Sequence, residues 1–172
     1  MPKEYGDYFA WGEVESKETY DWSTYRYGNG SAVLTKYCTK STYGNNGLVD
    51  NKIILDSEDD AATINWGGSW RMPTDEEMSE LRTKCTWEWI SQNGVKGHKV
   101  IGPNGNSIFL PAAGYIDGGN LNDVGSYGYY WSSSLYSNYP ADAYNMYFGS
   151  GYKSRGTDFD RYYGLSVRPV CQ

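Results

Sequence analysis

Side chains that commonly carry catalysis are few in this sequence, and their spacing matches no familiar catalytic arrangement. His98 is the single histidine of 172 residues. A zinc site built from several histidines is therefore excluded, and any Ser-His-Asp triad would depend on this residue alone. Its Gly-Lys surroundings favour an exposed position at the edge of a strand. The chain has no Gly-x-Ser-x-Gly elbow, Walker-type loop or helix-opening Gly-x-Gly-x-x-Gly motif. We therefore expect no enzymatic activity.

Five acidic residues between positions 50 and 60 form the densest group of carboxylates. Carboxylate oxygens are ligands that Ca²⁺ prefers, so a structural calcium ion is the one cofactor that the sequence suggests. The spacing does not match an EF-hand loop, and a solvated acidic first turn of a helix fits the residues better. We therefore expect no cofactor. A glycosidase would need two facing acids, and nothing here selects a pair. The five acids are Asp50, Asp56, Glu58, Asp59 and Asp60.

The three cysteines lie far apart and form no Cys-x-x-Cys pair. Cys38, Cys85 and Cys171 leave one thiol over if any two of them pair. A Cys38–Cys85 or Cys85–Cys171 disulfide fits this count, but three buried or terminal thiols fit it better.

Charge and hydropathy exclude two classes of partner. The net charge is −6, no basic run occurs, and the mean hydropathy is −0.70. Nucleic acid is therefore not an expected partner, because a groove for phosphates must be basic. No stretch approaches the roughly 18 apolar residues of a membrane span. No signal peptide precedes Tyr5, so we expect a domain cut from a longer chain.

The chemistry that the sequence does supply is that of a binding surface. Eleven of the 18 tyrosines lie at or after Tyr115, among Ser, Asn, Gly and Asp residues. Tyr gives a large amphipathic contact area at low entropic cost, and Ser, Gly and Asn adapt their hydrogen bonds to a partner, as in antibody paratopes. Tyrosines also fill sheet faces, which is the simpler interpretation for strand residues such as Tyr129 and Tyr144. The loop tyrosines are less well explained by packing.

Two helices are predicted in the middle of the chain. The first begins at an N-cap on Ser57 and ends after Trp66, before two glycines. The second begins at Thr74, where Thr-Asp-Glu-Glu has the capping-box pattern. Its apolar face carries Met78, Leu81 and Cys85.

Strands and turns account for the rest of a single α+β domain that spans residues 1–172. Residues 5–43 predict short strands and long loops held by aromatic rings. A hairpin joins 99–101 to 107–110. Three further strands, expected to form an antiparallel meander, are predicted at 129–134, 143–148 and 164–170. Polar loops then fall at 117–127, 136–142 and 149–161.

Six motifs resemble the Fibrobacter succinogenes-type major paralogous domain, and the similarity runs from about residue 6 to residue 170. The resemblance implies a C-type-lectin-like fold. It also implies an extracellular protein, anchored in full length to a bacterial outer membrane, often behind a lipoprotein signal. The motifs are GDYFAWGE at 6–13, DDAA at 59–62, WGGSWRMPT at 66–74, NSIFLPAAG at 106–114, YWSSS at 130–134 and GLSVRPV at 164–170.

Related C-type-lectin-like domains include the variable proteins of diversity-generating retroelements. Mutagenesis of Asn codons near their C-terminus yields Tyr, Ser, Asp, Gly and Asn on the ligand-binding face. This sequence is similar, because the same residue set crowds between Tyr115 and Tyr163. The formylglycine-generating oxidases are another relative, but their chemistry needs a reactive cysteine pair, which the wide cysteine spacing here does not match.

These observations predict a non-enzymatic adhesion or recognition domain that binds a protein or carbohydrate at a cell surface. A structural module of a pilus or surface layer and an enzyme related to the formylglycine-generating oxidases are the alternatives. The predicted contact residues are Asn120, Asn122, Tyr136, Asn138, Tyr139, Tyr144, Asn145, Tyr147, Tyr152, Lys153, Arg155, Asp158, Phe159 and Tyr162.

Overall fold

The beginning and the end of the chain meet in one five-stranded sheet. In the computed structural model, which describes residues 5–171, β1 (Tyr8–Phe9) pairs antiparallel with β11 (Leu165–Ser166). β11 runs parallel to β8 (Gly128–Leu135), which continues antiparallel into β9 (Ala143–Gly149) and β10 (Tyr152–Gly156). The sheet order is β1-β11-β8-β9-β10. The predicted α+β class is confirmed, but the expected all-antiparallel meander is wrong because β11 joins β8 in parallel.

Helix α2 (Asp75–Lys84) covers one face of this sheet and begins as predicted. The Thr74 hydroxyl accepts the Glu77 amide N–H at 3.3 Å, and the Glu77 carboxylate accepts the Thr74 N–H at 2.9 Å. Both arms of the capping box are therefore present. Arg71 grips the same carboxylate through two bonds of 2.7 Å. Met78 is buried against the sheet, so the apolar face lies where the spacing placed it.

The first predicted helix begins later than expected. Residues Ser57–Asp59 form a 3₁₀ turn, and α1 spans only Ala61–Trp66. Its N-cap is Asp60, whose carboxylate accepts the Thr63 amide at 2.9 Å and also the Met72 amide at 2.9 Å. A carboxylate that satisfies two backbone donors at once holds the cap better than a serine that satisfies one, so the Ser57 assignment is wrong. The helix ends before Gly67 (φ +66°), as predicted.

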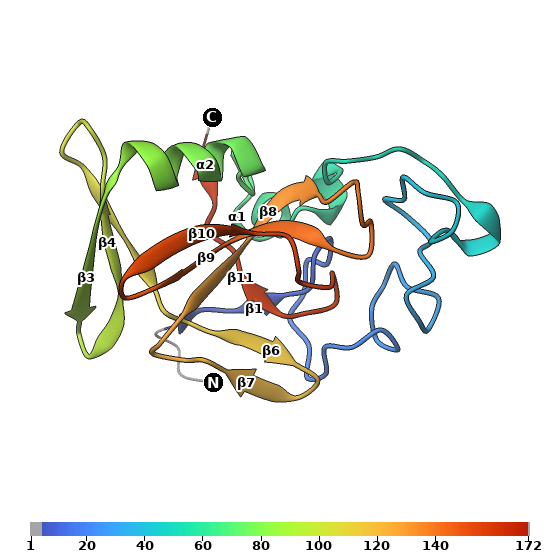
Figure 1. Cartoon of the computed structure of the whole chain (residues 1–172), viewed down its shortest axis with the longest axis horizontal. Helices are drawn as coiled ribbons and strands as arrows, with labels where there is room; N and C mark the ends of the chain where they lie inside the picture. The colour runs from blue at the N-terminus through green and yellow to red at the C-terminus, as the bar shows by residue number, and fades with distance from the viewer. Residues whose placement is uncertain (1–4, 172) are drawn as a thin grey trace.

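A three-stranded sheet forms one end of the molecule (Figure 1). The predicted hairpin is confirmed as β4 (Val95–Ile101) and β5 (Ser107–Pro111). An additional strand that was not predicted, β3 (Thr86–Gln92), pairs with β4 through a turn at Asn93-Gly94. Both turn residues have positive φ, 51° and 83°, which is the Asn-Gly signal for a tight hairpin.

Four short strands complete the structure. β2 (Trp70–Arg71) pairs with β12 (Val170–Cys171), so the strand predicted at 164–170 is interrupted rather than continuous. β6 (Tyr115–Asp117) and β7 (Asn120–Asn122) form a hairpin inside a predicted loop. The predicted loop at 149–161 likewise contains β10. Short strands of this kind carry too little periodicity to be recognised from sequence.

The N-terminal region, residues 5–60, consists mainly of loops, and most of it lies at the opposite end from the three-stranded sheet (Figure 1). Aromatic rings hold it, as predicted: Tyr20 and Tyr25 are buried, and their hydroxyls donate to backbone carbonyls. Arg161 joins this region to the C-terminal segment. Its fully buried guanidinium donates to the Tyr25 hydroxyl at 2.9 Å and to three backbone carbonyls.

No helix within residues 5–171 is both long enough and apolar enough to span a membrane.

Candidate ligand-binding site

Strand alternation sends two sets of aromatic side chains to opposite faces of the five-stranded sheet. In β8 and β9, Tyr130 and Phe148 pack under α2. Tyr129 and Tyr147 point the other way and face each other across the strands, with nearly parallel rings 6.1 Å apart. Six more rings join this pair on the side away from α2. We call the group the aromatic face: Tyr115, Tyr127, Tyr129, Tyr147, Tyr152, Phe159, Tyr162 and Tyr163.

The rings of the aromatic face form one connected cluster drawn from several segments. Tyr115, in β6, lies 5.2 Å from Tyr129 and 5.1 Å from Phe159. At the other end, Tyr152 lies 5.8 Å from Tyr147 and 6.2 Å from Tyr127. Mutual edge-to-face and tilted contacts fix the ring orientations before any ligand arrives. Preordered rings of this kind lose little entropy on binding.

The rest of the chain covers the cluster only in part. Seven of its eight rings are partly buried, and Tyr152 is 48% exposed. The tyrosines that pack the N-terminal region are buried instead; Tyr8 and Tyr20 have no exposed area. The aromatic face therefore offers apolar ring area and hydroxyl groups to solvent on the same surface.

Burial and nearby carboxylates keep these phenols protonated. The Tyr129 hydroxyl donates to Asp123 at 2.9 Å, and burial followed by this bond raises the pKa of Tyr129 far above its ordinary value. Burial also raises the pKa of Tyr115, with a further contribution from Asp123. The pKa of Tyr162 is raised by burial, then by its hydrogen bond with Tyr163. At neutral pH the face therefore presents neutral phenols that can both donate and accept.

Two aspartates anchor the loop that carries Phe159, Tyr162 and Tyr163. Asp142 precedes β9, and its backbone bridges to Asp160. Burial raises the pKa of both carboxyls, and the neighbouring Asp160 charge raises that of Asp142 further. Two carboxyls so close share a proton, because both cannot ionise cheaply in a buried place. The pair therefore fastens the loop to the edge of β9.

A buried amide lies beside the cluster without a hydrogen-bond partner. Asn145 is 1% exposed, and neither its side-chain oxygen nor its nitrogen has a partner in residues 5–171. It stands two positions before Tyr147 on the same strand, so both side chains leave β9 on the same side. Its neighbour on β10 is Gly156, where a Cβ would come within 2.3 Å of the amide oxygen. An amide buried at this cost is typical of a functional position.

Several predicted contact residues do come together at the aromatic face. They are Tyr147, Tyr152, Phe159 and Tyr162, with Asn145 beside them rather than exposed as predicted. Asn120 and Asn122 share the Tyr115 side of the β6–β7 hairpin, because they pair with Asp117 and Tyr115. Asp158 precedes Phe159, is exposed, and contributes to the raised pKa of Asp142.

Other predicted residues lie elsewhere. Lys153 and Arg155 belong to β10 and not to a loop, and both lean toward the face that α2 covers. Arg155 lies 3.8 Å from the Tyr144 ring centroid and forms a 2.8 Å ion pair with Asp75 of α2. Lys153 lies over Trp87. Strand alternation directs the predicted side chains of Tyr144, Lys153 and Arg155 away from the aromatic face.

The remaining predicted residues lie in the loop between β8 and β9. Tyr136 contacts Tyr144, and Tyr139 packs on Tyr43 with ring centroids 5.0 Å apart. The backbone carbonyl of Asn138 accepts a 2.6 Å bond from Lys40. Asn138 and Tyr139 thus tie the C-terminal third to the N-terminal loops.

Four members of the aromatic face are absent from the predicted contact residues: Tyr115, Tyr127, Tyr129 and Tyr163. The alternation of Tyr127, Tyr129 and Trp131 was a usable signal, because it places two tyrosines on the same side of β8. It was instead interpreted as sheet filling. Only the absence of a covering layer distinguishes the two interpretations.

His98 is buried, at 5% exposure, in the middle strand of the three-stranded sheet. The expectation of an exposed strand edge is therefore wrong. Its Nε2 lies 2.8 Å from the Gly149 carbonyl, and rings of Trp87, Trp89 and Phe148 surround it. The aromatic setting favours a packing role.

The acidic group at 50–60 is also more structural than predicted. Asp59 is buried and accepts hydrogen bonds from the hydroxyls of Tyr27 and Tyr37. Oxygens of Asp56, Glu58 and Asp59 lie within 4.8 Å of one another. The Lys36 ammonium reaches all three, at 2.8, 3.4 and 2.6 Å. A lysine thus already supplies the positive charge that these carboxylates need.

The thiols are separated in the fold. Cys38 and Cys85 form no disulfide. Cys38 is buried, and its thiol donates to the Lys40 carbonyl. Cys171 belongs to β12, and its Sγ lies 2.9 Å from Ser69 Oγ. This arrangement agrees with the preferred interpretation of unpaired structural thiols for Cys38 and Cys85.

Comparison with known proteins identifies a family without an assigned activity. Residues 85–170, half of the chain, match the model described as Domain of unknown function (DUF8237), and the chain belongs to this family. The matched region contains the whole aromatic face. Searches of the curated proteins and of the solved structures each found no significant match.

Proposed function

We propose that this member of a family of unknown function is a non-enzymatic recognition domain of a bacterial surface protein, and that its aromatic face binds the ligand. The observation that carries the proposal is the connected cluster of eight partly exposed rings on one side of the sheet. Soluble domains rarely leave such an area open without a partner. Tyrosine is also among the residues most often found at the energetic centre of an interface.

The surroundings of the face favour a ligand with positive charge. Asp117 and Asp123 flank Tyr115, and both contribute to its raised pKa. Asp158 lies on the loop beside Phe159. Lys153 and Arg155, the cations of β10, lean to the opposite side of the sheet. Aromatic faces attract ammonium and guanidinium groups, and flanking carboxylates strengthen that attraction. We therefore infer a protein ligand that inserts Lys or Arg side chains between the rings, with carbohydrate as the alternative.

The topology supports a C-type-lectin-like fold. Strands from the two ends of the chain, β1 and β11, pair with each other, and two helices follow the N-terminal loops. In the C-terminal third, β8, β9 and β10 form an antiparallel meander. All eight rings of the aromatic face come from that C-terminal third. This placement agrees with the variable proteins of diversity-generating retroelements, whose diversified residues lie near the C-terminus. We propose that the aromatic face is the diversified surface of such a protein.

A paired set of tyrosine variants tests the proposed surface. The domain is used to probe an array of bacterial and host surface proteins and glycans. Tyr147→Ala/Tyr152→Ala removes one half-buried and one exposed ring from the aromatic face. Tyr136→Ala/Tyr139→Ala likewise removes one partly buried and one exposed ring, but from the loop before β9, outside the aromatic face. Since a central interface residue contributes about 2 kcal/mol or more, we expect the first variant to bind at least about 30-fold more weakly.

The control variant should bind like the wild type, and thermal unfolding should show that both variants are folded. Equal affinities for the wild type and Tyr147→Ala/Tyr152→Ala would reject the aromatic face as the binding surface. A domain that binds nothing but assembles into polymers would favour the structural module of a pilus or surface layer.

A further inference from the structure

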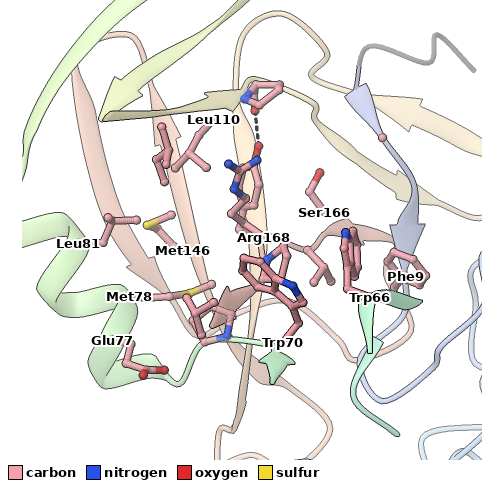
Figure 2. A pocket seen from close by; sticks show the side chains of 18 of the residues that line it. Phe9, Trp66, Trp70, Glu77, Met78, Leu81, Leu110, Met146, Ser166 and Arg168 are labelled. Atoms are coloured by element: carbon pink, nitrogen blue, oxygen red, sulfur yellow. Dashed lines mark hydrogen bonds between the residues drawn. The ribbon is translucent and has the colours of Figure 1, made fainter. Parts of the chain in front are cut away.

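A large groove lies on the other side of the five-stranded sheet, and Tyr130 and Met146 are among the residues that line it. Figure 2 shows Met146 beside the residues of α2. The volume of the groove is about 1270 Å³, larger than that of most small-ligand pockets. Five parts of the chain enclose it. They are the N-terminal residues 5–9, the segment from α1 to β2, helix α2, strand β5 and the residues that link β11 to β12.

The walls of the groove are mainly apolar. Figure 2 shows Met78, Leu81 and Met146 on one side of the view and Phe9 and Trp66 on the other. Trp66 is 49% exposed and Trp70 is 40% exposed, the former being the last residue of α1. Gly67 and Gly68 separate the two indoles and both adopt positive φ, +66° and +62°. This turn lets both indoles line the groove rather than enter the core.

Ser166 and Arg168 both line the groove, and neither side chain has a hydrogen-bond partner among the described residues. Ser166 is 4% exposed, and its hydroxyl makes no hydrogen bond within residues 5–171. Arg168 is exposed, and no hydrogen bond or ion pair to it is formed by the described residues. The two residues are two positions apart on the segment that leaves β11, and both line the groove. A hydroxyl buried without a partner is costly, so a ligand that accepts its proton would recover the lost bond.

Two acids line the groove, Asp7 and Glu77, and neither forms an ion pair with Arg168 among the described residues. The nearest acidic candidate on α2, Glu77, is already held by Arg71 through two 2.7 Å bonds and by the Thr74 amide. The charge of Arg168 instead acts on the Tyr130 phenol, where it opposes the rise in pKa that burial causes. Tyr130 donates its hydroxyl to the Pro111 carbonyl at 2.8 Å, as the dashed line in Figure 2 shows. The guanidinium therefore faces the floor of the groove with its donors unused.

We propose that this groove is a second binding site, for an amphipathic carboxylate. The carboxylate group pairs with the Arg168 guanidinium and accepts the Ser166 hydroxyl proton, and the apolar body lies along Trp66, Trp70 and Met78. A planar guanidinium matches a carboxylate with two parallel hydrogen bonds. The apolar walls account for the rest of the ligand, because they can bury its hydrocarbon. This site and the aromatic face lie on opposite sides of the sheet, so the two proposals stand independently.

Calorimetry with two matched probes tests the site. Decanoate and decanol, each below its aggregation limit, share an alkyl chain and differ in the charged group. We expect decanoate to bind with one-to-one stoichiometry and at least about tenfold more tightly than decanol, since a charge-assisted pair contributes about 1.5 kcal/mol or more.

Arg168→Gln should weaken decanoate binding at least about tenfold and leave decanol binding unchanged. Trp66→Ala should weaken both probes by a similar factor. Arg155→Gln is the control, because it removes an exposed arginine that pairs with Asp75 and does not line the groove; its decanoate affinity should equal that of the wild type. Absence of binding, decanoate affinity no better than that of decanol, several decanoate molecules per domain, or unchanged affinity in folded Arg168→Gln would each overturn the proposal.

Discussion

The N-terminal region and the aromatic face both depend on tyrosine, yet they use it in opposite ways. In the N-terminal region, Tyr8, Tyr20 and Tyr25 are buried, and each hydroxyl donates to one backbone carbonyl, at 2.5, 2.6 and 2.7 Å. On the aromatic face, Tyr147 and Tyr152 are partly or largely exposed, and their rings contact other rings. A buried phenol must have a specific partner, because an unsatisfied hydroxyl is costly. An exposed phenol can leave its hydrogen bonds to water and to a ligand.

The same contrast holds for charge. In the N-terminal region, Lys36, Lys52 and Arg26 together balance the charges of Asp56, Glu58 and Asp59. Beside the aromatic face, Asp142 and Asp160 face each other, and their pKa values rise. One region is therefore a neutralised, hydrogen-bonded core made largely of loops. The other retains acidic groups and open aromatic area, which is what recognition of a partner requires.

The largest expected effect comes from breaking the ion pair in the N-terminal region. Asp59→Asn removes the buried negative charge that Lys36, Tyr27 and Tyr37 share. We expect the free energy of unfolding in urea to fall by about 3 kcal/mol, because one partner of a buried pair is lost. Glu58→Gln is the matched control. Glu58 pairs with the same lysine, but its side chain is 77% exposed, so its substitution should lower the free energy of unfolding by less than about 0.5 kcal/mol. Similar losses in both variants would contradict a buried anchor.

A smaller effect compares one hydroxyl in each region. Tyr20→Phe deletes a buried hydroxyl that donates to the Tyr8 carbonyl and accepts from the Lys17 amide. We expect it to lower the free energy of unfolding by about 1 kcal/mol or somewhat more. Tyr147→Phe deletes the same atom from the aromatic face and should change stability by less than about 0.5 kcal/mol. Chemical denaturation of both variants measures the difference, and an equal loss would erase the distinction between the two regions.

The smallest expected effect is a pH dependence of opposite sign in the two regions. Hydrogen bonds from Lys36 and Lys52 lower the pKa of Asp56 to about 2, so its contribution to stability is lost only as the pH falls from about 4 toward that value. Burial and Asp160 raise the pKa of Asp142 instead. Its contribution is complete below the ordinary carboxyl pKa and is lost as the pH rises through the raised value.

Asp142→Asn should therefore reduce the loss of melting temperature between about pH 5 and about pH 8, by roughly 2 to 4 °C for each kcal/mol recovered. Asp123→Asn, which changes an exposed acid near the same face, is the control and should keep the wild-type slope. Scanning calorimetry across the pH range checks both. An unchanged slope in Asp142→Asn would mean that the pair does not share a proton.

The sequence alone determined the features that local chemistry controls. The capping box at Thr74 and Glu77 needs only residues three positions apart, and Gly67 ends α1 through its own backbone freedom. The hairpin at 99–110 follows from two apolar runs and a turn. The excess of tyrosine after Tyr115 also predicted a binding surface, because the composition of a segment can be read without knowing its fold.

Only the tertiary structure decided which tyrosines form a surface. Alternation places Tyr129 and Tyr130 on opposite faces of β8, but it does not say which face α2 will cover. Helix α2 covers the Tyr130 side, and Lys153, Arg155 and Tyr144 go with it. The other face is buried at Trp131 and Asn145 but stays partly exposed at Tyr129 and Tyr147, where it collects rings from β6 and the 157–163 loop. The physical reason is that burial depends on contacts between segments far apart in the chain, and no local pattern records those contacts.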